Sequence, residues 1–164
     1  WPVTLYHPHV PSAAPLLAEG RHIASIDGGC SLKVDGQLNA LVLPERPGGA
    51  FSWFAYDGLP TATALDHQAP SADSVNIRWG RNALEVLERG AELSLCRHLE
   101  TGRVLEVLTE YLYVDRGVTR CEDSTDYRLA VRPGDTLSVV RRISDRALVK
   151  KDGVTGWYFG RLAH

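Results

Sequence analysis

The stretch that decides the fold lies near the C-terminal end and reads LAVRPGDTLSVV (129–140), RALVK (146–150), KDG (151–153) and VTGWY (154–158). Its three strand candidates, Thr136–Val140, Arg146–Lys150 and Val154–Tyr158, are short and rich in β-branched and aromatic residues. Turns that contain Asp or Gly separate them. Evenly spaced short strands without a long helical period are typical of barrels and sandwiches. We therefore predict an all-β fold that ends in a small barrel.

Strand signals recur upstream of this stretch. Asp35-Gly36 lies between Ser31–Val34 and Gln37–Leu43, which predicts a type I′ hairpin because both central residues of that turn need a positive φ. Phe51–Tyr56 is an aromatic strand candidate. Glu92–His98 alternates polar and apolar residues, as a half-buried strand does. Thr101-Gly102 then turns the chain back into a further strand at 103–107.

Weaker signals fill the remaining chain and set the expected division into parts. Residues 60–75 have little periodicity and are predicted to form a loop, with a short helix around Thr63–His67 as the alternative. Four prolines in residues 1–19 predict an extended Pro-rich arm, with a helical turn at Ala13–Glu19. We expect a β-rich unit over 20–107 and the barrel over 108–164, joined by a short link near Leu105–Glu110.

Composition excludes several classes of function. The chain has 164 residues, of which 44% are hydrophobic, so it can build a core. Its formal charge of -2, from 18 basic and 20 acidic residues, is unsuited to binding nucleic acid. The sequence contains no apolar run long enough to predict a membrane span. The chain starts at Trp1 and contains no Met, which we interpret as an excised fragment.

Three cysteines, Cys30, Cys96 and Cys121, bear on the cellular compartment. Their odd number and wide spacing favour free thiols and hence a reducing, cytoplasmic location. One disulfide with a spare thiol remains the alternative. Cys121, flanked by Arg120 and Glu122, is expected to be the most exposed thiol.

The motifs of the last third, taken in order, resemble an SH3 domain. The resemblance rests on Leu112-Tyr113-Val114-Asp115 as the opening segment, Glu122-Asp123-Ser124-Thr125-Asp126 as the acidic loop, the run Leu129–Leu137 with its Gly134-Asp135 turn, and Gly156-Trp157-Tyr158-Phe159 near the end. It implies a small barrel. It also implies a groove that holds proline-rich peptides between aromatic side chains.

The groove departs from that pattern. Ala147-Leu148 stands near the family's tryptophan, while Phe159 and Leu162 replace its later proline and tyrosine, so only Tyr113 matches the aromatic set. The acidic cluster suits a basic partner, or else consists of solvated charges whose pairs contribute only about 0–1 kcal/mol. The expected partner-binding residues are Tyr113, Asp115, Glu122, Asp123, Asp126, Trp157 and Phe159.

A second resemblance lies in the first half. Cys30, Leu41-Val42-Leu43-Pro44 and Gly49-Ala50-Phe51 resemble the core pattern of cysteine-containing all-β modules in Themis-type signalling adaptors, which are also built from SH3-like barrels. Glu45 and Gly28 depart from apolar positions of that pattern. The aromatic residues of Phe51–Tyr56 are expected to be core, with an interface as the alternative.

No set of residues predicts an enzyme. His7-Pro8-His9 on an arm is a poor metal site. His22, Ser25, Asp27 and Cys30 lack the strand–turn–helix context of a nucleophile. We expect no catalytic residue, metal or cofactor. The sequence favours a non-catalytic protein-interaction or scaffold fragment whose barrel docks on a protein or peptide partner, or on a neighbouring domain of its parent. The alternative is a bacterial-type SH3-like module that binds a cell-wall or surface polymer beside an enzyme.

Overall fold

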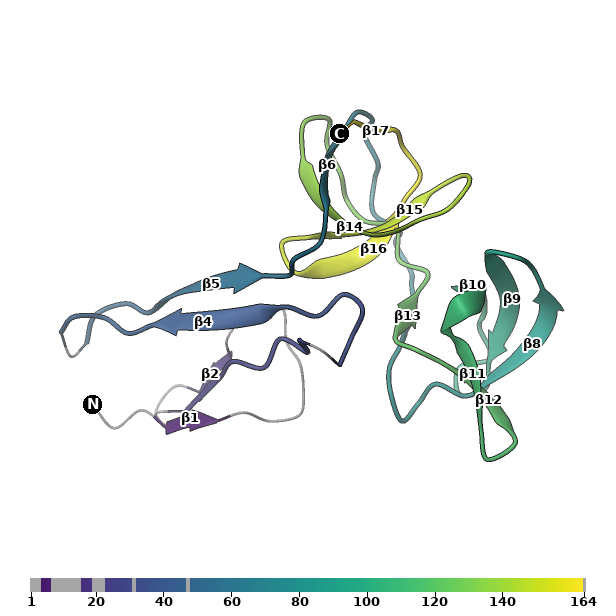
Figure 1. The fold of residues 1–164 in the computed structure, drawn as a ribbon, viewed down its shortest axis with the longest axis horizontal. Coiled ribbons are helices and arrows are strands. Elements are labelled where there is room, and N and C mark those ends of the chain that lie inside the picture. The colour runs from purple at the N-terminus through teal and green to yellow at the C-terminus, as the bar shows by residue number, and fades with distance from the viewer. Residues whose placement is uncertain (1–3, 7–15, 19–22, 31, 47, 164) are drawn as a thin grey trace.

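The computed structural model describes residues 4–6, 16–18, 23–30, 32–46 and 48–163 (Figure 1). Strands make up nearly all of its regular structure, so the all-β prediction is confirmed. Among the described residues, the one helical element is the single 3-10 turn η1 (Thr109–Tyr111). No helix in this part of the chain is long and apolar enough to cross a membrane.

A five-stranded antiparallel sheet contains the stretch 129–158. Its spatial order is β16 (Val154–Tyr158), β15 (Ala147–Lys151), β14 (Thr136–Arg142), β6 (Thr61–Ala64) and β17 (Leu162–Ala163). The three strands expected there all form, and Asp152 and Gly153 take the positive φ values, 51° and 78°, that the turn between β15 and β16 needs.

Strand β6 corrects the prediction of a loop or helix over 60–75. Its alternating Thr-Ala pattern is weak in sequence, but Ala62 and Ala64 are buried while the threonines are exposed. Strand β6 pairs with β14 on one side and β17 on the other, and Ala64 packs in the core of the sheet. That core comprises Ala64, Leu129, Val131, Leu137, Ala147, Val149 and Tyr158.

A second unit is inserted between β6 and β14, and its strands occupy the teal and green chain of Figure 1. It contains the sheet of β8 (Leu84–Arg89), β9 (Leu93–His98) and β10 (Val104–Leu108). The hairpin of β11 (Leu112–Asp115) with β12 (Val118–Cys121) and the pair of β7 (Asn76–Ile77) with β13 (Ser124–Thr125) complete it. We call residues 75–125 the inserted unit, and residues 60–68 with 127–163 the five-stranded unit.

These packing units differ from the predicted ranges 20–107 and 108–164. Residues 61–64 belong to the same sheet as residues 136–163, although more than seventy positions separate β6 from β14. The expected link at 105–110 is strand β10 followed by η1. Leu112–Asp115 pairs with β12, and no pairing with β14 occurs in the described residues. Pairing between distant segments, which local patterns do not encode, produces these differences.

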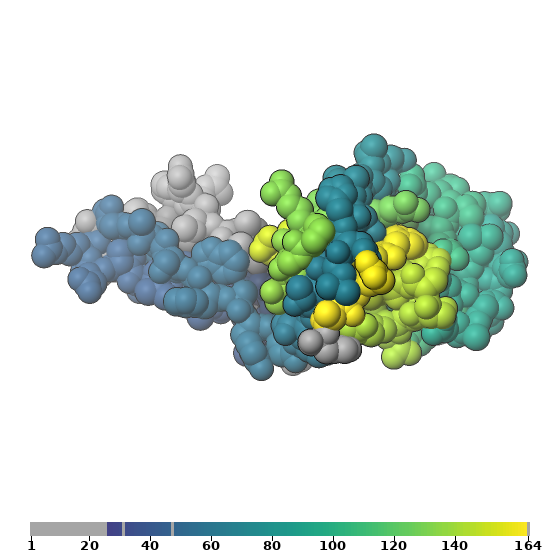
Figure 2. Space-filling model, turned by 90° about the horizontal axis from the view of Figure 1, so that it is seen from above, coloured from purple at the N-terminus to yellow at the C-terminus, as the bar shows by residue number. Residues whose placement is uncertain are grey.

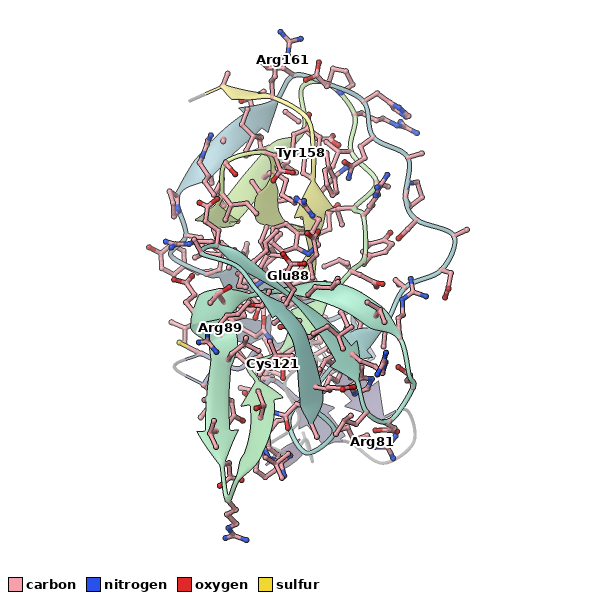
Figure 3. The ribbon with its side chains drawn as sticks, turned by 90° about the vertical axis from the view of Figure 1, so that its right-hand side faces the viewer. Arg81, Glu88, Arg89, Cys121, Tyr158 and Arg161 are labelled. Atoms are coloured by element: carbon pink, nitrogen blue, oxygen red, sulfur yellow. The ribbon has the colours of Figure 1, made fainter. Side chains whose placement is uncertain are left out.

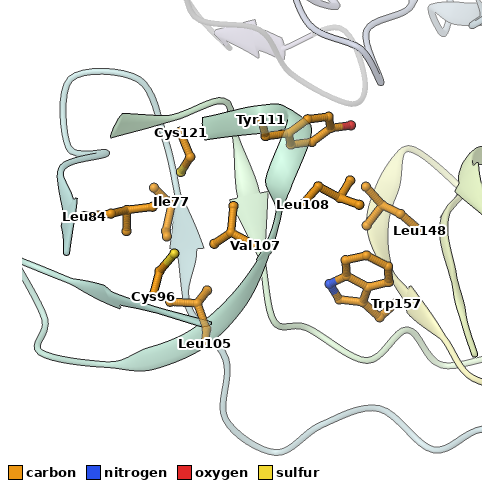
Figure 4. Close-up of a cluster of buried hydrophobic side chains, with 10 residues drawn as sticks. All are labelled: Ile77, Leu84, Cys96, Leu105, Val107, Leu108, Tyr111, Cys121, Leu148 and Trp157. Carbon is orange, nitrogen blue, oxygen red and sulfur yellow. The ribbon is translucent and has the colours of Figure 1, made fainter. Parts of the chain in front are cut away.

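The two units share a continuous core. Leu148 and Trp157 come from β15 and β16 of the five-stranded unit. Their side chains pack into a cluster otherwise made by the inserted unit, beside Val107 and Leu108 (Figure 4). In the view of Figure 3 the five-stranded unit, with Tyr158 and Arg161, lies above the inserted unit, with Cys121 and Arg81. The units are therefore joined by apolar packing as well as by the chain.

The N-terminal part extends away from this two-unit body (Figure 2). Strand β3 (Ile23–Ser25) pairs with β1 (Thr4–Tyr6) in parallel and with β2 (Leu16–Ala18) in antiparallel orientation. The residues of the expected arm and helical turn that the structure describes, 4–6 and 16–18, are thus strands. Beyond them, β4 (Leu38–Val42) forms a hairpin with β5 (Ser52–Tyr56).

The type I′ hairpin predicted at Asp35-Gly36 is wrong. The backbone N–H groups of Leu32 and Lys33 both donate to the carbonyl of Gly29, at 3.0 Å each, so the chain before Asp35 is a coil of turns. Gly29 has a φ of 73°, which glycine adopts without strain. The partner of β4 is consequently β5, across the loop of residues 43–51.

Candidate partner-binding surface

The seven residues expected to bind a partner are not gathered at one place. Tyr113 and Asp115 lie on β11 of the inserted unit, whereas Trp157 and Phe159 belong to the five-stranded unit. The hydroxyl of Tyr113 accepts a hydrogen bond from the Asn82 side chain at 3.0 Å. Asp115 pairs with Arg120 at 3.4 Å. Both residues therefore have roles within the inserted unit.

The acidic residues are mostly used to hold loops. Asp123 accepts the backbone N–H of Trp79 at 3.0 Å and pairs with Lys33. Asp126 accepts the backbone N–H of Val75 at 2.7 Å and pairs with Arg103. The hydrogen bonds that Arg103 donates to Asp73 and Asp126 raise the pKa of its guanidinium. Only Glu122 of the cluster is exposed, so a continuous acidic surface does not form.

Trp157 is a core residue, and its neighbour Phe159 is not. Trp157 is only 5% exposed, and its indole N–H donates to the carbonyl of Thr125 in the inserted unit at 2.8 Å. Phe159 is 39% exposed. Phe159 follows the last residue of β16, so the indole lies between the two units while the phenyl ring is at the surface beside their junction.

Two arginines flank the Phe159 ring. The guanidinium carbons of Arg128 and Arg146 each lie 4.7 Å from its centroid, a distance at which a cation is attracted to the ring's π face. We call Phe159, Arg128 and Arg146 the Phe159 surface. Sequence reasoning missed both arginines, because they are eighteen positions apart and only the fold brings them to one ring.

The two arginines differ in their electrostatic surroundings. Arg146 pairs with Asp145 at 2.9 Å and with Glu106 of the inserted unit at 2.6 Å. The hydrogen bonds that Arg146 donates to Asp145 and to Glu106 raise the pKa of its guanidinium, and burial opposes this shift. Arg128 has no carboxylate partner among the described residues. It is therefore the cation of this surface that is available to an acidic group.

The backbone of the Phe159 surface is held by one amide side chain. Gln68 accepts the N–H of Phe159 at 2.9 Å and donates to the carbonyls of Leu129 and Trp157, both at 2.8 Å. Nearby, hydrogen bonds from the side chain and backbone of Arg161 lower the pKa of Asp66 to about 2. Gln68 thus fixes the backbone of Phe159 to the segments that contain Leu129 and Trp157.

A second exposed apolar area lies on the β4–β5 hairpin and corrects the expectation that its aromatics are core. The cross-strand register places Leu38, Val42, Phe54 and Tyr56 on one face, with exposures of 58%, 41%, 68% and 71%. In the part of the chain described, no other strand pairs with β5. The aromatic residues are exposed because the hairpin projects from the body instead of packing on it.

No disulfide joins the three cysteines, and their exposure reverses the expectation. Cys121 is buried, whereas Cys30 is exposed. The alternation of β9 also places Cys96 on its buried face. Burial raises the pKa of the Cys121 thiol to about 11, which makes it unreactive at neutral pH. His7-Pro8-His9 and His22 lie outside the described residues, as do the side chains of Ser25 and its predecessors.

Comparison with protein-family models, with curated proteins and with solved structures found no match to this chain. The interpretation of its function therefore rests on the geometry of the described residues.

Proposed function

We propose that this chain is a non-catalytic protein-interaction scaffold, in which residues 60–68 and 127–163 form a divergent SH3-like barrel. In this proposal β6 takes the place that the resemblance gave to residues 112–115, and the inserted unit occupies a loop of the barrel. The barrel then docks on a neighbouring unit of its own chain through Leu148 and Trp157. The single observation that carries the proposal is the exposure of Phe159, held between Arg128 and Arg146 beside that junction.

The chemistry of the Phe159 surface favours a partner with an apolar side chain and a carboxylate. A rigid aromatic ring beside arginine has the composition of binding hot spots. Arg128 lacks an acidic neighbour in the described residues, so a partner carboxylate would form its first ion pair. The acids that would attract a basic peptide, Asp123 and Asp126, are already bonded to the protein. We therefore expect an acidic partner segment rather than a basic one.

A proton–nitrogen correlation spectrum of the labelled chain tests this function. Two proline-containing peptides of equal length are titrated, one flanked by Glu and the other by Lys. The Glu peptide is expected to shift the amides of Phe159, Arg128 and Gln68, and the Lys peptide to leave them in place. Because a solvent-exposed ion pair contributes only about 0–1 kcal/mol, the affinity is expected to be modest.

Matched variants decide whether the shifts report this surface. Phe159→Ala is expected to abolish them, whereas Val154→Ala, which truncates an exposed residue of β16, leaves them unchanged. If neither peptide moves any amide of the folded chain, the barrel does not read peptides. Equal shifts in both variants would place the interaction elsewhere on the molecule.

A further inference from the structure

A cavity with a volume of about 280 Å³ lies between the five-stranded sheet and the base of the β4–β5 hairpin. On the hairpin side it is lined by Gln37, Tyr56 and Asp57, and on the sheet side by Thr61, Ser138 and Lys150. Asp152, in the turn after β15, also lines it.

A row of polar residues crosses the sheet at this cavity. Strand register places Thr61 of β6 opposite Ser138 of β14, and Ser138 opposite Lys150 of β15. Lys150 is in turn opposite Thr155 of β16. Neighbouring strands lie ~4.8 Å apart, so the row presents evenly spaced hydroxyl and ammonium groups. We call Thr61, Ser138, Lys150 and Thr155 the polar row.

The ammonium group of Lys150 has hydrogen-bonding capacity that the described residues do not fully use. Lys150 is only 6% exposed, yet its ammonium group makes a single hydrogen bond among the described residues, to the carbonyl of Asp35 at 2.9 Å. Asp57 lies 4.0 Å away, which is an ion pair but too long for a hydrogen bond. An ammonium group carries three donors, so Lys150 has capacity for a further acceptor inside the cavity.

Other polar groups around the cavity are also available. In the described chain the hydroxyls of Thr61, Ser138 and Tyr56 make no hydrogen bond. Thr155 differs, because its hydroxyl already donates to the Asp35 carboxylate. The cavity therefore offers both hydrogen-bond donors and hydrogen-bond acceptors to a ligand. The exposed ring of Tyr56 stands at its edge.

The charges select against ionic ligands. Lys150 at the base opposes a cation, while Asp57 and Asp152 oppose an anion. A neutral ligand that carries several hydroxyl groups meets neither penalty, and each hydroxyl can both donate and accept. The face of Tyr56 adds an apolar platform for the C–H face of such a ring.

We propose that this cavity is a binding site for one unit of an uncharged saccharide, held by Thr61, Ser138 and Lys150 of the polar row together with Asp57 and Tyr56. The site is distinct from the Phe159 surface, so it would give the chain a second binding activity. It also supplies a place for the surface polymer considered as the alternative function from the sequence.

Methyl glycosides of glucose, galactose, mannose and N-acetylglucosamine are the probes. Each is titrated into the labelled chain and followed by the amides of Tyr56, Thr61, Ser138 and Lys150. At least one glycoside is expected to shift these amides with a Kd on the order of 1 mM, as suits so small a ligand. Acetate and N-acetylarginine amide, the charged comparisons, are expected to leave them in place.

Two pairs of variants locate the effect. Ser138→Ala and Tyr56→Ala are each expected to weaken the glycoside by about tenfold, the effect of losing one well-used contact. Ser52→Ala and Phe54→Ala, exposed neighbours on β5 outside the cavity, leave affinity unchanged. The proposal is overturned if no glycoside shifts the cavity amides, if only a charged probe does so, or if both cavity variants bind the glycoside with undiminished affinity.

Discussion

Leu148→Ala tests whether the two units share one core. Leu148 belongs to the five-stranded sheet and is 6% exposed, but its side chain packs with the inserted unit. The substitution removes three carbons, or about 2.4 kcal/mol at ~0.8 kcal/mol per buried CH₂ group. The cavity left at a junction between two rigid sheets adds to this loss. We expect the free energy of unfolding to fall by about 3–4 kcal/mol.

Hydrogen exchange locates where that stability is lost. Because the core is continuous, amides of β9 and β10 in the inserted unit should lose protection together with amides of β14 and β15. A loss of about 3 kcal/mol corresponds to exchange faster by more than about 100-fold. Leu99→Ala, at a leucine 55% exposed after β9, is the control and should change stability by less than about 0.5 kcal/mol. If β9 and β10 keep full protection in Leu148→Ala, the units are independent and the reasoning fails.

Three further predictions follow from single side chains. Tyr158→Phe should lower the free energy of unfolding in urea by about 1–3 kcal/mol. The buried hydroxyl of Tyr158 donates to the carbonyl of Asp66 at 2.8 Å and accepts the Asp66 N–H at 3.0 Å. The control Tyr127→Phe should cost less, because the Tyr127 hydroxyl has no hydrogen bond in the described residues. The pKa of Cys121 is raised from 9.0 to about 11, so its contribution to stability is complete below pH 9 and is lost as pH rises toward 11. The contribution of Cys121 to the free energy of unfolding should fall by about 2–3 kcal/mol over that interval, and this pH dependence should be absent in the Cys121→Ala variant. At neutral pH a thiol reagent should modify Cys30 in the native chain and reach Cys96 and Cys121 only after denaturant is added; rapid native labelling of a Cys30→Ala variant would contradict the burial of the other two.

Strand positions were the most predictable feature of the chain. Residues 92–98 alternate polar and apolar side chains, and residues 136–158 are rich in β-branched and aromatic residues and are interrupted by Gly- and Asp-containing turns. Such patterns act over a few residues, and each of these strands formed near its expected place. The hairpin predicted at Asp35-Gly36 did not form. Its Asp-Gly pair is typical of a hairpin turn, but the carbonyl of Gly29 accepts two backbone N–H groups, and the residues before Asp35 form turns instead of a strand.

The candidate sites were much less predictable. Phe159 was expected from its place in a motif, but Arg128 and Arg146 have no local signature. They meet the ring only because the segments that follow β13, precede β15 and follow β16 converge. The polar row was missed entirely. Thr61 is far from Ser138 and Lys150 in sequence, and their alignment depends on the register between β6, β14 and β15.

The sequence by itself determined the all-β class, the strands of the C-terminal stretch and the burial of Trp157, because side-chain alternation and turn chemistry are local. Only the tertiary structure decided that β6 joins a sheet whose other strands lie beyond an inserted unit. It also decided that Cys121 is buried and that the aromatic residues of β5 are exposed. These outcomes depend on which distant strand covers which face, and a residue's own neighbours in sequence carry no information about that choice.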